Sequence, residues 1–404
     1  MCINMNTISV KIDGNKVEIS KPSFVNLLDY PLIKELKIYK EALHNSEVSF
    51  PNLKDLANRA CVPYPLFFAP ENIINEQIRR KDKLVYQKLP SKNEISIASR
   101  GTLNISDIEL IARDLGRKQE FIKRRVLVDS VINPFVGIAC TGKKINKSIV
   151  FTAKHIREYL DLDLCIFRSK SKKEALTYLC RLAEKINIFI AFSSRDFMPQ
   201  NLRREVLFSG MCIKDSRFPF VFINRRELDD NPVILESEGR QIFTIMCMLV
   251  CISLNKFVFS IKDMKKTDDS FKNIFLIAGE IIVPKSDLVG LRIDSIDKLK
   301  DLAKKFKVTP SLLLMRLIDL GQISKTTSDM YFNVLKRARI GKKEGGRRPN
   351  TVDGYIKYNG ERFSKEVSSA YLSKKVTYLD ISSLLFRQSK ASKKLVHDYV
   401  SRFN

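Results

Sequence analysis

Cys247 and Cys251 are the side chains in this sequence whose type and spacing come closest to a metal site. Side chains at positions i and i+4 lie on the same face of a helix, so the two thiols would point in the same direction. A structural zinc site needs four ligands, however, and His44, His155 and His397 lie far away in the sequence. The apolar neighbours of the pair also disfavour the thiolate that binds metal. We therefore predict that both thiols pack in a core and that the chain uses no metal or other cofactor.

The sequence patterns of other catalytic families are incomplete or absent. No Gly-x-x-x-x-Gly-Lys-Ser/Thr phosphate loop, Gly-x-Ser-x-Gly nucleophile elbow or dinucleotide-binding fingerprint occurs. Glu227, Asp229 and Asp230 form an acidic cluster, which a solvated turn explains more simply than a general acid–base pair. An enzyme with a different kind of site, such as a nuclease-like toxin, remains an alternative without a catalytic constellation to support it.

The charge of the chain is its strongest compositional signal. Its 404 residues are enough for two or three domains, and a hydrophobic fraction of 44% is enough for a buried core. The formal net charge is +26, which favours polyanionic partners such as DNA, RNA or anionic lipid. A general enrichment in lysine is the alternative explanation, and the many Lys, Ile and Asn residues make it credible.

The eight cysteines are scattered, mostly within apolar runs, and form no Cys-x-x-Cys pair. Such positions are typical of reduced core thiols rather than of a disulfide framework. No N-terminal segment has the pattern of a secretory signal. The longest apolar stretch, 242–254, is shorter than the roughly 20 residues that span a bilayer. We expect a cytoplasmic protein that does not enter the membrane.

The periodicity of apolar residues predicts a helix-rich α+β fold. Expected strands lie at 7–12, 16–19, 188–192 and 218–223; expected helices lie at 30–44, 52–60, 106–126, 152–160, 171–185, 236–254 and 269–282, and a polar connector at 72–98. Residues 295–323 are predicted to form two helices around a tight joint at Val308-Thr309-Pro310. A basic loop follows, and then a terminal segment, 354–404, with a hairpin-like start and two short helices. Pro219 indicates that the strand at 218–223 is an edge strand or begins late.

Several short stretches occur in an order that resembles the ImmA/IrrE family of zincin-like metallopeptidases. They are Phe50-Pro51-Asn52-Leu53, Leu56-Ala57, Val62-Pro63, Leu66-Phe67, Phe135-Val136-Gly137, Phe222-Ile223-Asn224, Arg240-Gln241-Ile242-Phe243-Thr244, Ala278 and Ile282-Val283-Pro284. The resemblance covers roughly residues 45 to 325. It implies a zincin-like core with a small β-sheet, preceded by the end of a repressor-type helix-turn-helix, of which only the last helix is recognisable.

The resemblance also implies where a metal site would lie. Active relatives carry His-Glu-x-x-His after Phe-Thr, with both histidines on zinc and the glutamate polarising water. Those positions fall on Cys247, Met248 and Cys251, and the third ligand falls near Phe271 on the next helix. No replacement is a histidine or a carboxylate. The resemblance therefore implies a pseudo-metallopeptidase without catalytic residues.

The same comparison divides the chain and points to partners. The expected units are residues 1–75, a connector and helix at 76–130, the zincin-like core at 131–290, a helix-turn-helix-like hairpin at 291–325, and a basic linker with a small C-terminal domain at 326–404. We expect a regulator or effector of a mobile-element, toxin–antitoxin or phage-defence module. Its partner would be nucleic acid or a protein encoded nearby, such as a repressor, toxin or antitoxin. Such a partner would add a strand beside Phe222, Ile223 and Asn224, taken as an edge strand.

The alternative is direct binding of DNA or RNA by the C-terminal third of the chain. In that case the hairpin would present polar and basic side chains to phosphates or bases, and the basic run after it would follow the phosphate backbone. A hairpin that only closes the core, and a solvated basic loop, are the simpler explanations. The residues assigned to this interface are Thr309, Ser311, Arg316, Lys325, Lys336, Arg337, Arg339, Lys342, Lys343, Arg347 and Arg348.

Overall fold

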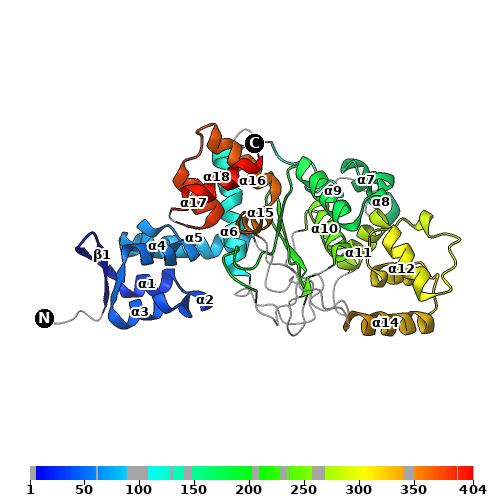
Figure 1. The fold of residues 1–404 in the computed structure, drawn as a ribbon, viewed down its shortest axis with the longest axis horizontal. Helices are drawn as coiled ribbons and strands as arrows, with labels where there is room; N and C mark the ends of the chain where they lie inside the picture. Colours follow the sequence, from blue (N-terminus) through cyan, green and yellow to red (C-terminus); the bar gives the residue numbers. More distant parts are fainter. Residues whose placement is uncertain are drawn as a thin grey trace.

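The structure, a computed structural model, describes most of the chain (Figure 1). The described residues are 6–60, 62–88, 108–127, 131–140, 148–202, 209–227, 234–235, 237–256, 269–340, 350–388 and 390–403. Helices dominate and the sheets are small, so the expected helix-rich α+β class is confirmed. Within these ranges, no helix combines the length and the apolar character needed to cross a membrane.

The N-terminal residues form a module with a hydrophobic core of its own. Strands β1 (Thr7–Ile12) and β2 (Asn15–Ser20) pair in antiparallel register, and β3 (Glu47–Ser49) pairs parallel to β1. The predicted strand pair is confirmed, and β3 was not foreseen. Its helices are α1 (Lys21–Leu27), α2 (Pro31–Lys34), α3 (Lys37–Asn45) and α4 (Phe50–Arg59), followed by the 3-10 helix Tyr64–Phe68.

Two helices connect this module to the rest of the chain. The predicted connector is wrong up to residue 88, because α5 (Glu71–Lys88) is a helix, and its remainder lies outside the described residues. Helix α6 (Glu109–Phe121) continues into a π-helical turn, Ile122–Val126. The helix predicted at 106–126 is therefore confirmed from residue 109 onward, and residues 106 and 107 lie outside the described ranges. Leu110 belongs to the N-terminal core, whereas Ile111 and Leu115 belong to the core behind the central sheet. Helix α6 is therefore shared by two cores.

The central sheet has the strand order β4-β6-β5. Strands β4 (Phe189–Phe192) and β6 (Phe220–Ile223) are parallel, and β5 (Gly210–Ile213) runs antiparallel to β6. A two-stranded pair, β7 (Arg226–Glu227) and β8 (Ile234–Leu235), follows. All of β6 is buried, and its side chains alternate between two different cores. Burial on both faces explains why the strand is apolar throughout.

Pro219 marks a late strand beginning, because β6 starts at Phe220. The edge-strand interpretation of this segment is wrong, since β6 lies between β4 and β5. A central strand has both rows of backbone groups paired, and proline fits there only outside the ladder.

The helices of the middle of the chain lie on one side of the sheet in a shared hydrophobic core; residues 172–185 and 238–253 pack on the strands, and the other helices pack behind them (Figure 1). These helices are α7 (Ile149–Tyr159), α8 (Leu164–Ser169), α9 (Lys172–Lys185), α10 (Glu238–Ser253), α11 (Asp269–Ile282), the 3-10 turn Lys285–Asp287, α12 (Ile296–Lys305), α13 (Pro310–Asp319) and α14 (Lys325–Ile340). The predicted helices in this region are confirmed, and α11 has the predicted bounds.

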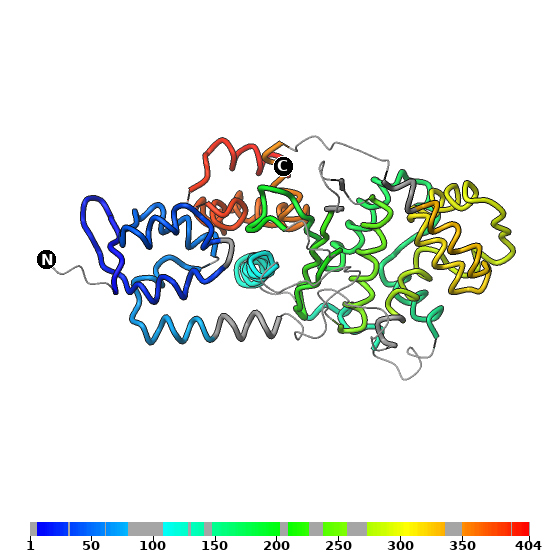
Figure 2. Tube along the Cα trace, turned by 90° about the horizontal axis from the view of Figure 1, so that it is seen from below, coloured from blue at the N-terminus to red at the C-terminus, as the bar shows by residue number. Residues whose placement is uncertain are grey.

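The other face is covered by α6 and the C-terminal helices, which Figure 2 shows side by side with the sheet. These are α15 (Thr351–Asn359), α16 (Glu361–Leu372), α17 (Tyr378–Phe386), α18 (Lys393–Val400) and the 3-10 turn Ser401–Phe403. The expected hairpin-like start at residue 354 is wrong, because these residues are helical. The helices also share their core with the sheet, so they are not the separate small domain that the sequence suggested.

Candidate functional site

Helix α10 is buried on every side along the stretch that the resemblance assigns to metal ligands. Every residue from Thr244 to Ser253 is buried, and Cys247, Met248 and Cys251 have no exposed surface. The Met248 sulfur lies 3.3 Å from the thiol of Cys212 on β5, which places the glutamate-equivalent position against the sheet. The predicted core packing of Cys247 and Cys251 is therefore what the structure shows.

The electrostatics of these thiols do not fit a metal site. Burial raises the pKa of Cys251 to about 12 and raises the pKa of Cys247 well above its usual value. The thiolate that zinc requires is thus disfavoured. Within the described residues, no three His, Cys, Asp or Glu side chains gather as a metal-binding group. Phe271, at the third ligand position, lies in α11, and its side chain is not described.

The strand assigned to partner binding lies inside the protein. Phe222 and Ile223 have no exposed surface. Asn224 is also buried, and its backbone N–H donates to the Ser209 carbonyl at 2.8 Å. The predicted partner cleft at these residues is wrong, because both neighbours of β6 in the sheet are already present.

The helix pair α12–α13 is fixed to the core rather than free to present α13. Arg316 is buried; its guanidinium pairs with the Glu280 carboxylate on α11, and its Nε lies 3.3 Å from the Val283 carbonyl oxygen. The nucleic-acid role predicted for Arg316 is wrong, since its cation is already occupied by a buried partner. Thr309 caps α13 by accepting from the Leu312 amide at 3.2 Å. These contacts favour the hairpin that closes the core.

The other predicted nucleic-acid residues are spread over α13, α14 and the segment after it. Ser311 and Lys325 are exposed at the first turns of α13 and α14. Lys336, Arg337 and Arg339 lie in the last turns of α14, where a loop was expected, and their side chains are not described. Lys342, Lys343, Arg347 and Arg348 lie outside the described residues.

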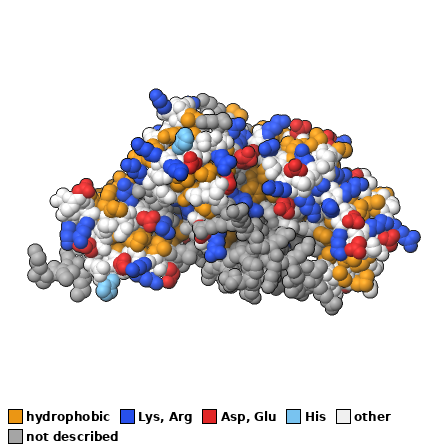
Figure 3. Space-filling view, in the orientation of Figure 1, with side chains coloured by type: hydrophobic (Ala, Val, Ile, Leu, Met, Phe, Trp, Pro, Cys, Tyr) orange, Lys and Arg blue, Asp and Glu red, His pale blue; other side chains and the backbone are white. Residues whose placement is uncertain are grey.

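A different basic surface lies on the C-terminal helices. Tyr378, the first residue of α17, follows the turn after α16, and its hydroxyl donates to the Ala391 carbonyl in the loop before α18. Exposed lysines stand on both segments, and we call them the basic corner: Lys374, Lys375, Lys390, Lys393 and Lys394. In the described part of the chain, none of the five has a carboxylate within ion-pair distance. Figure 3 shows Lys and Arg side chains recurring over the upper part of this face, where the C-terminal helices lie.

The basic corner is not explained by helix stability. Lys393 and Lys394 occupy the first two positions of α18, where the helix dipole disfavours positive charge. Leu372 and Leu379 are exposed beside the same turn, at 51% and 59%. Sequence reasoning missed this surface because it attributed the basic character of the tail to the run at 336–348. The sequence feature that could have revealed it is the two lysine pairs Lys374-Lys375 and Lys393-Lys394, which have no adjacent acidic residue to neutralise their charge.

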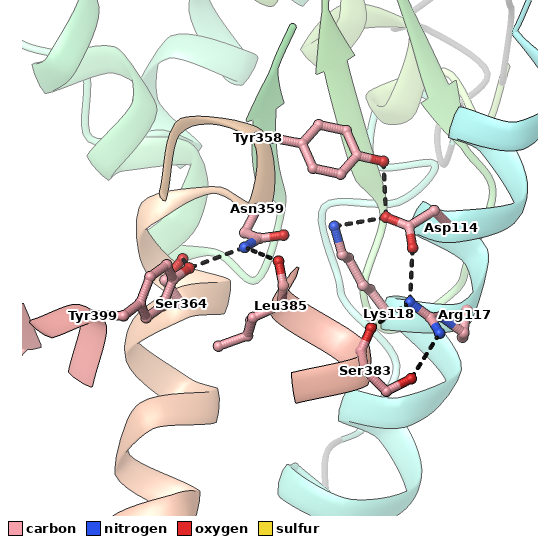
Figure 4. Close-up of polar contacts among 9 residues, drawn as sticks. All are labelled: Asp114, Arg117, Lys118, Tyr358, Asn359, Ser364, Ser383, Leu385 and Tyr399. Atoms are coloured by element: carbon pink, nitrogen blue, oxygen red, sulfur yellow. Dashed lines mark hydrogen bonds and ion pairs between the residues drawn. The ribbon is translucent and has the colours of Figure 1, made fainter. Parts of the chain in front are cut away.

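A buried polar network fixes the helices that carry the basic corner (Figure 4). Asp114 on α6 pairs with Lys118 at 2.8 Å and accepts from the Tyr358 hydroxyl at 2.8 Å and from Arg117 at 2.9 Å. Burial alone would raise the pKa of Asp114, but the positive charges of Lys118, Arg117 and Arg387 hold it well below its usual value. Burial lowers the pKa of Lys118, against the effect of the carboxylate. The Lys118 ammonium also lies 4.0 Å from the centre of the Tyr358 ring.

The neighbouring contacts extend this network to the last two helices. Asn359 donates to the Leu385 carbonyl at 3.1 Å and to the Tyr399 hydroxyl at 3.0 Å, and Ser364 lies 2.6 Å from the same hydroxyl. Arg117 donates to the Ser383 carbonyl at 3.0 Å. Figure 4 shows that these side chains come from α6 and from each of the four C-terminal helices. Buried hydrogen bonds and a shared hydrophobic core therefore join the four helices that carry the basic corner to α6.

One partial phosphate-loop pattern occurs at residues 137–143, where Gly-x-x-x-x-Gly-Lys is followed by Lys144 instead of a hydroxyl residue. A phosphate loop joins a strand to a helix. Here the amides of Gly137 and Ala139 donate to the Ile252 and Ser253 carbonyls at the end of α10. Residues 141–147 lie outside the described ranges. The described part of this pattern, residues 137–140, therefore satisfies backbone carbonyl groups at the C-terminal end of α10.

Comparison with known proteins finds no relative of this chain. No family model, no curated protein and no solved structure matches the chain.

Proposed function

We propose that the chain is a non-catalytic binding protein with a zincin-like core, which contacts the phosphate backbone of a nucleic acid through the basic corner. Such a protein would act as the regulator or effector that the resemblance to the ImmA/IrrE family implies. The proposal has two parts, one for the core and one for the surface, and each has its own test.

The burial of α10 is the observation that supports the loss of catalysis. A hydrolytic zinc needs an open coordination position that water can reach. Cys247, Met248 and Cys251 instead have no exposed surface, and Met248 packs against Cys212 of the sheet. A metal in this place would have to displace core side chains and bind thiols whose pKa values are raised by burial.

Metal analysis of the purified full-length chain tests this part. We expect much less than one zinc per chain, because the two thiols are protonated core groups at neutral pH. The double variant Cys247→Ala/Cys251→Ala should have the same metal content as the wild type. One equivalent of zinc that disappears in the double variant would overturn the proposal for the core.

The basic corner is the observation that supports nucleic-acid binding. Its lysines have no described carboxylate partner, so their charge is available to a ligand, and Lys393 and Lys394 oppose the dipole of their own helix. Lysine binds phosphate as a point charge and carries no base recognition. We therefore expect affinity for DNA or RNA that depends little on sequence and strongly on salt.

Electrophoretic mobility shift across a salt series tests this part, with an arbitrary duplex DNA and an arbitrary single-stranded RNA as probes. The corner variant replaces Lys374, Lys375, Lys393 and Lys394 by Gln. The control variant replaces four exposed lysines of α12 by Gln and so removes the same charge: Lys298, Lys300, Lys304 and Lys305.

We expect the corner variant to bind at least tenfold more weakly, with a salt slope reduced by about 3, since each phosphate contact contributes about 0.9 to that slope. The α12 control should lose less than threefold. Equal losses would show that only the net charge matters, and no binding by the wild type would overturn the proposal. Binding to vesicles of anionic lipid that exceeds binding to both nucleic acids would assign the corner, with Leu372 and Leu379, to a membrane surface instead.

A further inference from the structure

A cavity of about 340 Å³ lies along the free edge of β4. Its walls come from α9, from β4, from the second residue after β6, from the first turn of α10, and from α15 with its joint to α16. Charged groups on its wall are Lys173, Glu184, Arg225, Glu238, Asp353, Lys357 and Glu361; apolar groups include Leu176, Ile190, Phe192 and Ile356. Ligand pockets of small molecules begin at about this size and combine apolar walls with few convergent polar groups.

The joint between α15 and α16 closes one side of the cavity. Gly360 has a φ of +88°, and a Cβ at this position would lie 2.3 Å from the Ile190 carbonyl oxygen. Only glycine therefore allows the joint to approach β4 so closely. The Glu184 carboxylate at the end of α9 holds the joint by accepting from the Arg362 amide at 3.3 Å. The edge of β4 is thus covered by this chain and is not open to a partner strand.

One end of the cavity is cationic. Arg225, Lys357 and Lys173 line the same cavity, and burial together with the charges of Arg225 and Lys173 lowers the pKa of Lys357 to about 8. Burial also lowers the pKa of Arg225, which Glu238 opposes. The Asp353 carboxylate favours the charged form of Lys357. The same carboxylate also pairs with Arg402, whose Nη2 lies 3.4 Å from Asp353 Oδ1.

The opposite end is acidic. Glu184 and Glu361 interact there with each other and with the Cys180 thiol. Burial raises the pKa of Glu184 to about 7, so near neutral pH its carboxyl group either donates or accepts a hydrogen bond. Lys173 and Glu184 stand at opposite ends of α9, and eleven residues of helix span about 16 Å. The cavity therefore has a positive end, a carboxylic-acid end and apolar walls between them.

We propose that this cavity binds a small phosphate ester of mononucleotide size. Its phosphate lies among Arg225, Lys357 and Lys173, and a hydrogen-bonding group at its far end meets Glu184. An Arg fork recognises phosphate oxygens in pairs, and lysines add point charges around a dianion. Glu238 and Asp353 offset part of the charge of the three cations, while the other two carboxylates of the wall, Glu184 and Glu361, lie at the far end; a bound phosphate would complete the balance at the cationic end. This site is separate from the basic corner and does not depend on it.

Isothermal titration calorimetry with the full-length protein tests the site. The probes are the four ribonucleoside monophosphates and ribose 5-phosphate, each beside the same compound without phosphate. We expect at least one phosphate ester to bind at least tenfold more tightly than its dephosphorylated partner. Failure of all five esters to bind at millimolar concentration would overturn the proposal, as would equal binding of each ester and its partner.

Variants locate the binding. Lys357→Met and Arg225→Gln should each weaken the best ester at least tenfold, whereas Lys365→Met, on the exposed face of α16, should leave it unchanged. Arg225→Lys serves as the second substitution if Arg225→Gln does not fold, as judged by circular dichroism, and it should show an intermediate loss. The corner variant described above should keep the wild-type affinity. An unchanged affinity in folded Lys357→Met and Arg225→Lys would overturn the assignment.

Discussion

Replacing Asp114 by Asn should destabilise the protein strongly, because this carboxylate is the only described anion beside a fully buried ammonium. Asp114 and Lys118 each have no exposed surface and are 2.8 Å apart. The substitution keeps the size of the side chain but leaves the Lys118 charge without a counter-charge. Removing one partner of a buried ion pair typically costs about 3–5 kcal/mol, and loss of the good acceptor for Tyr358 and Arg117 acts in the same direction.

The assay is equilibrium unfolding in urea at pH 7, with the Lys365→Met variant as a surface control. We expect the free energy of unfolding to fall by about 3–5 kcal/mol in Asp114→Asn, and by no more than about 0.5 kcal/mol in the control. Lys118→Met in the Asp114→Asn background should recover a substantial part of the loss, because it removes the uncompensated charge.

Two outcomes would refute this reasoning. A loss below about 1 kcal/mol in Asp114→Asn would mean that water or another group reaches Lys118 and compensates its charge. A double variant no more stable than Asp114→Asn would show that the loss comes from the Tyr358 and Arg117 hydrogen bonds rather than from the ion pair. The double-variant cycle therefore separates the two contributions.

Three further predictions concern other buried groups. Arg316→Met should cost about 3–5 kcal/mol of unfolding free energy by leaving Glu280 buried and unpaired, and Arg316→Met/Glu280→Leu should recover most of it in urea melts. Because the pKa of Glu184 is raised to about 7 in the fold, stability from this group should fall as the pH rises from about 4.5 to 7, by at most about 3 kcal/mol, and Glu184→Gln should flatten this part of the profile. Cys247→Ala and Cys251→Ala should each lower the thermal melting temperature by a few degrees, as cavities in a core do; a higher melting temperature would contradict their core role.

Helices and strands whose apolar residues follow a single clear periodicity were predictable from the sequence. The spacing of apolar residues located α11 with its bounds, and Ser171, which accepts from the Glu174 amide, explains why α9 begins where expected. The first strand pair was also predicted, and the residues that join its strands, Asp13 and Gly14, both have positive φ, a conformation that this residue pair favours. In each case a local rule agrees with the tertiary structure.

The position of each element in space was not predictable in the same way. Phe220 and Phe222 gave no sign that their strand is central, because a strand apolar on both faces and a short buried edge strand have the same pattern. Arg316 has the sequence context of an exposed helix residue, and only the approach of Glu280 from α11 shows that it is buried. Non-local pairs of this kind are decided by packing, which a single sequence does not reveal.

The cavity was missed for the same reason. Arg225, Lys357 and Lys173 come from three segments separated by tens to more than a hundred residues, and no spacing rule connects them. The sequence contained one local clue, Gly360, which permits the close approach of the α15–α16 joint to β4. Glycine occurs at helix junctions for several structural reasons, however. Its role here becomes clear only once the structure shows how closely the α15–α16 joint approaches β4.

The burial of α10 determines where binding can occur on this protein. Helix α10 packs against α9, α11 and both β5 and β6. An apolar helix tolerates such complete enclosure and adds stability through its buried surface, but it offers no charged side chains to a ligand there. The side chains with available charge then lie at the periphery of the sheet: the cavity at the free edge of β4, and the basic corner on the helices behind it. The basic corner is separate from α10, whereas the first turn of α10 contributes Glu238 to the wall of the cavity. Substitutions at Lys357, on α15, or at Lys374, in the turn after α16, should therefore leave the core packing of α10 unchanged.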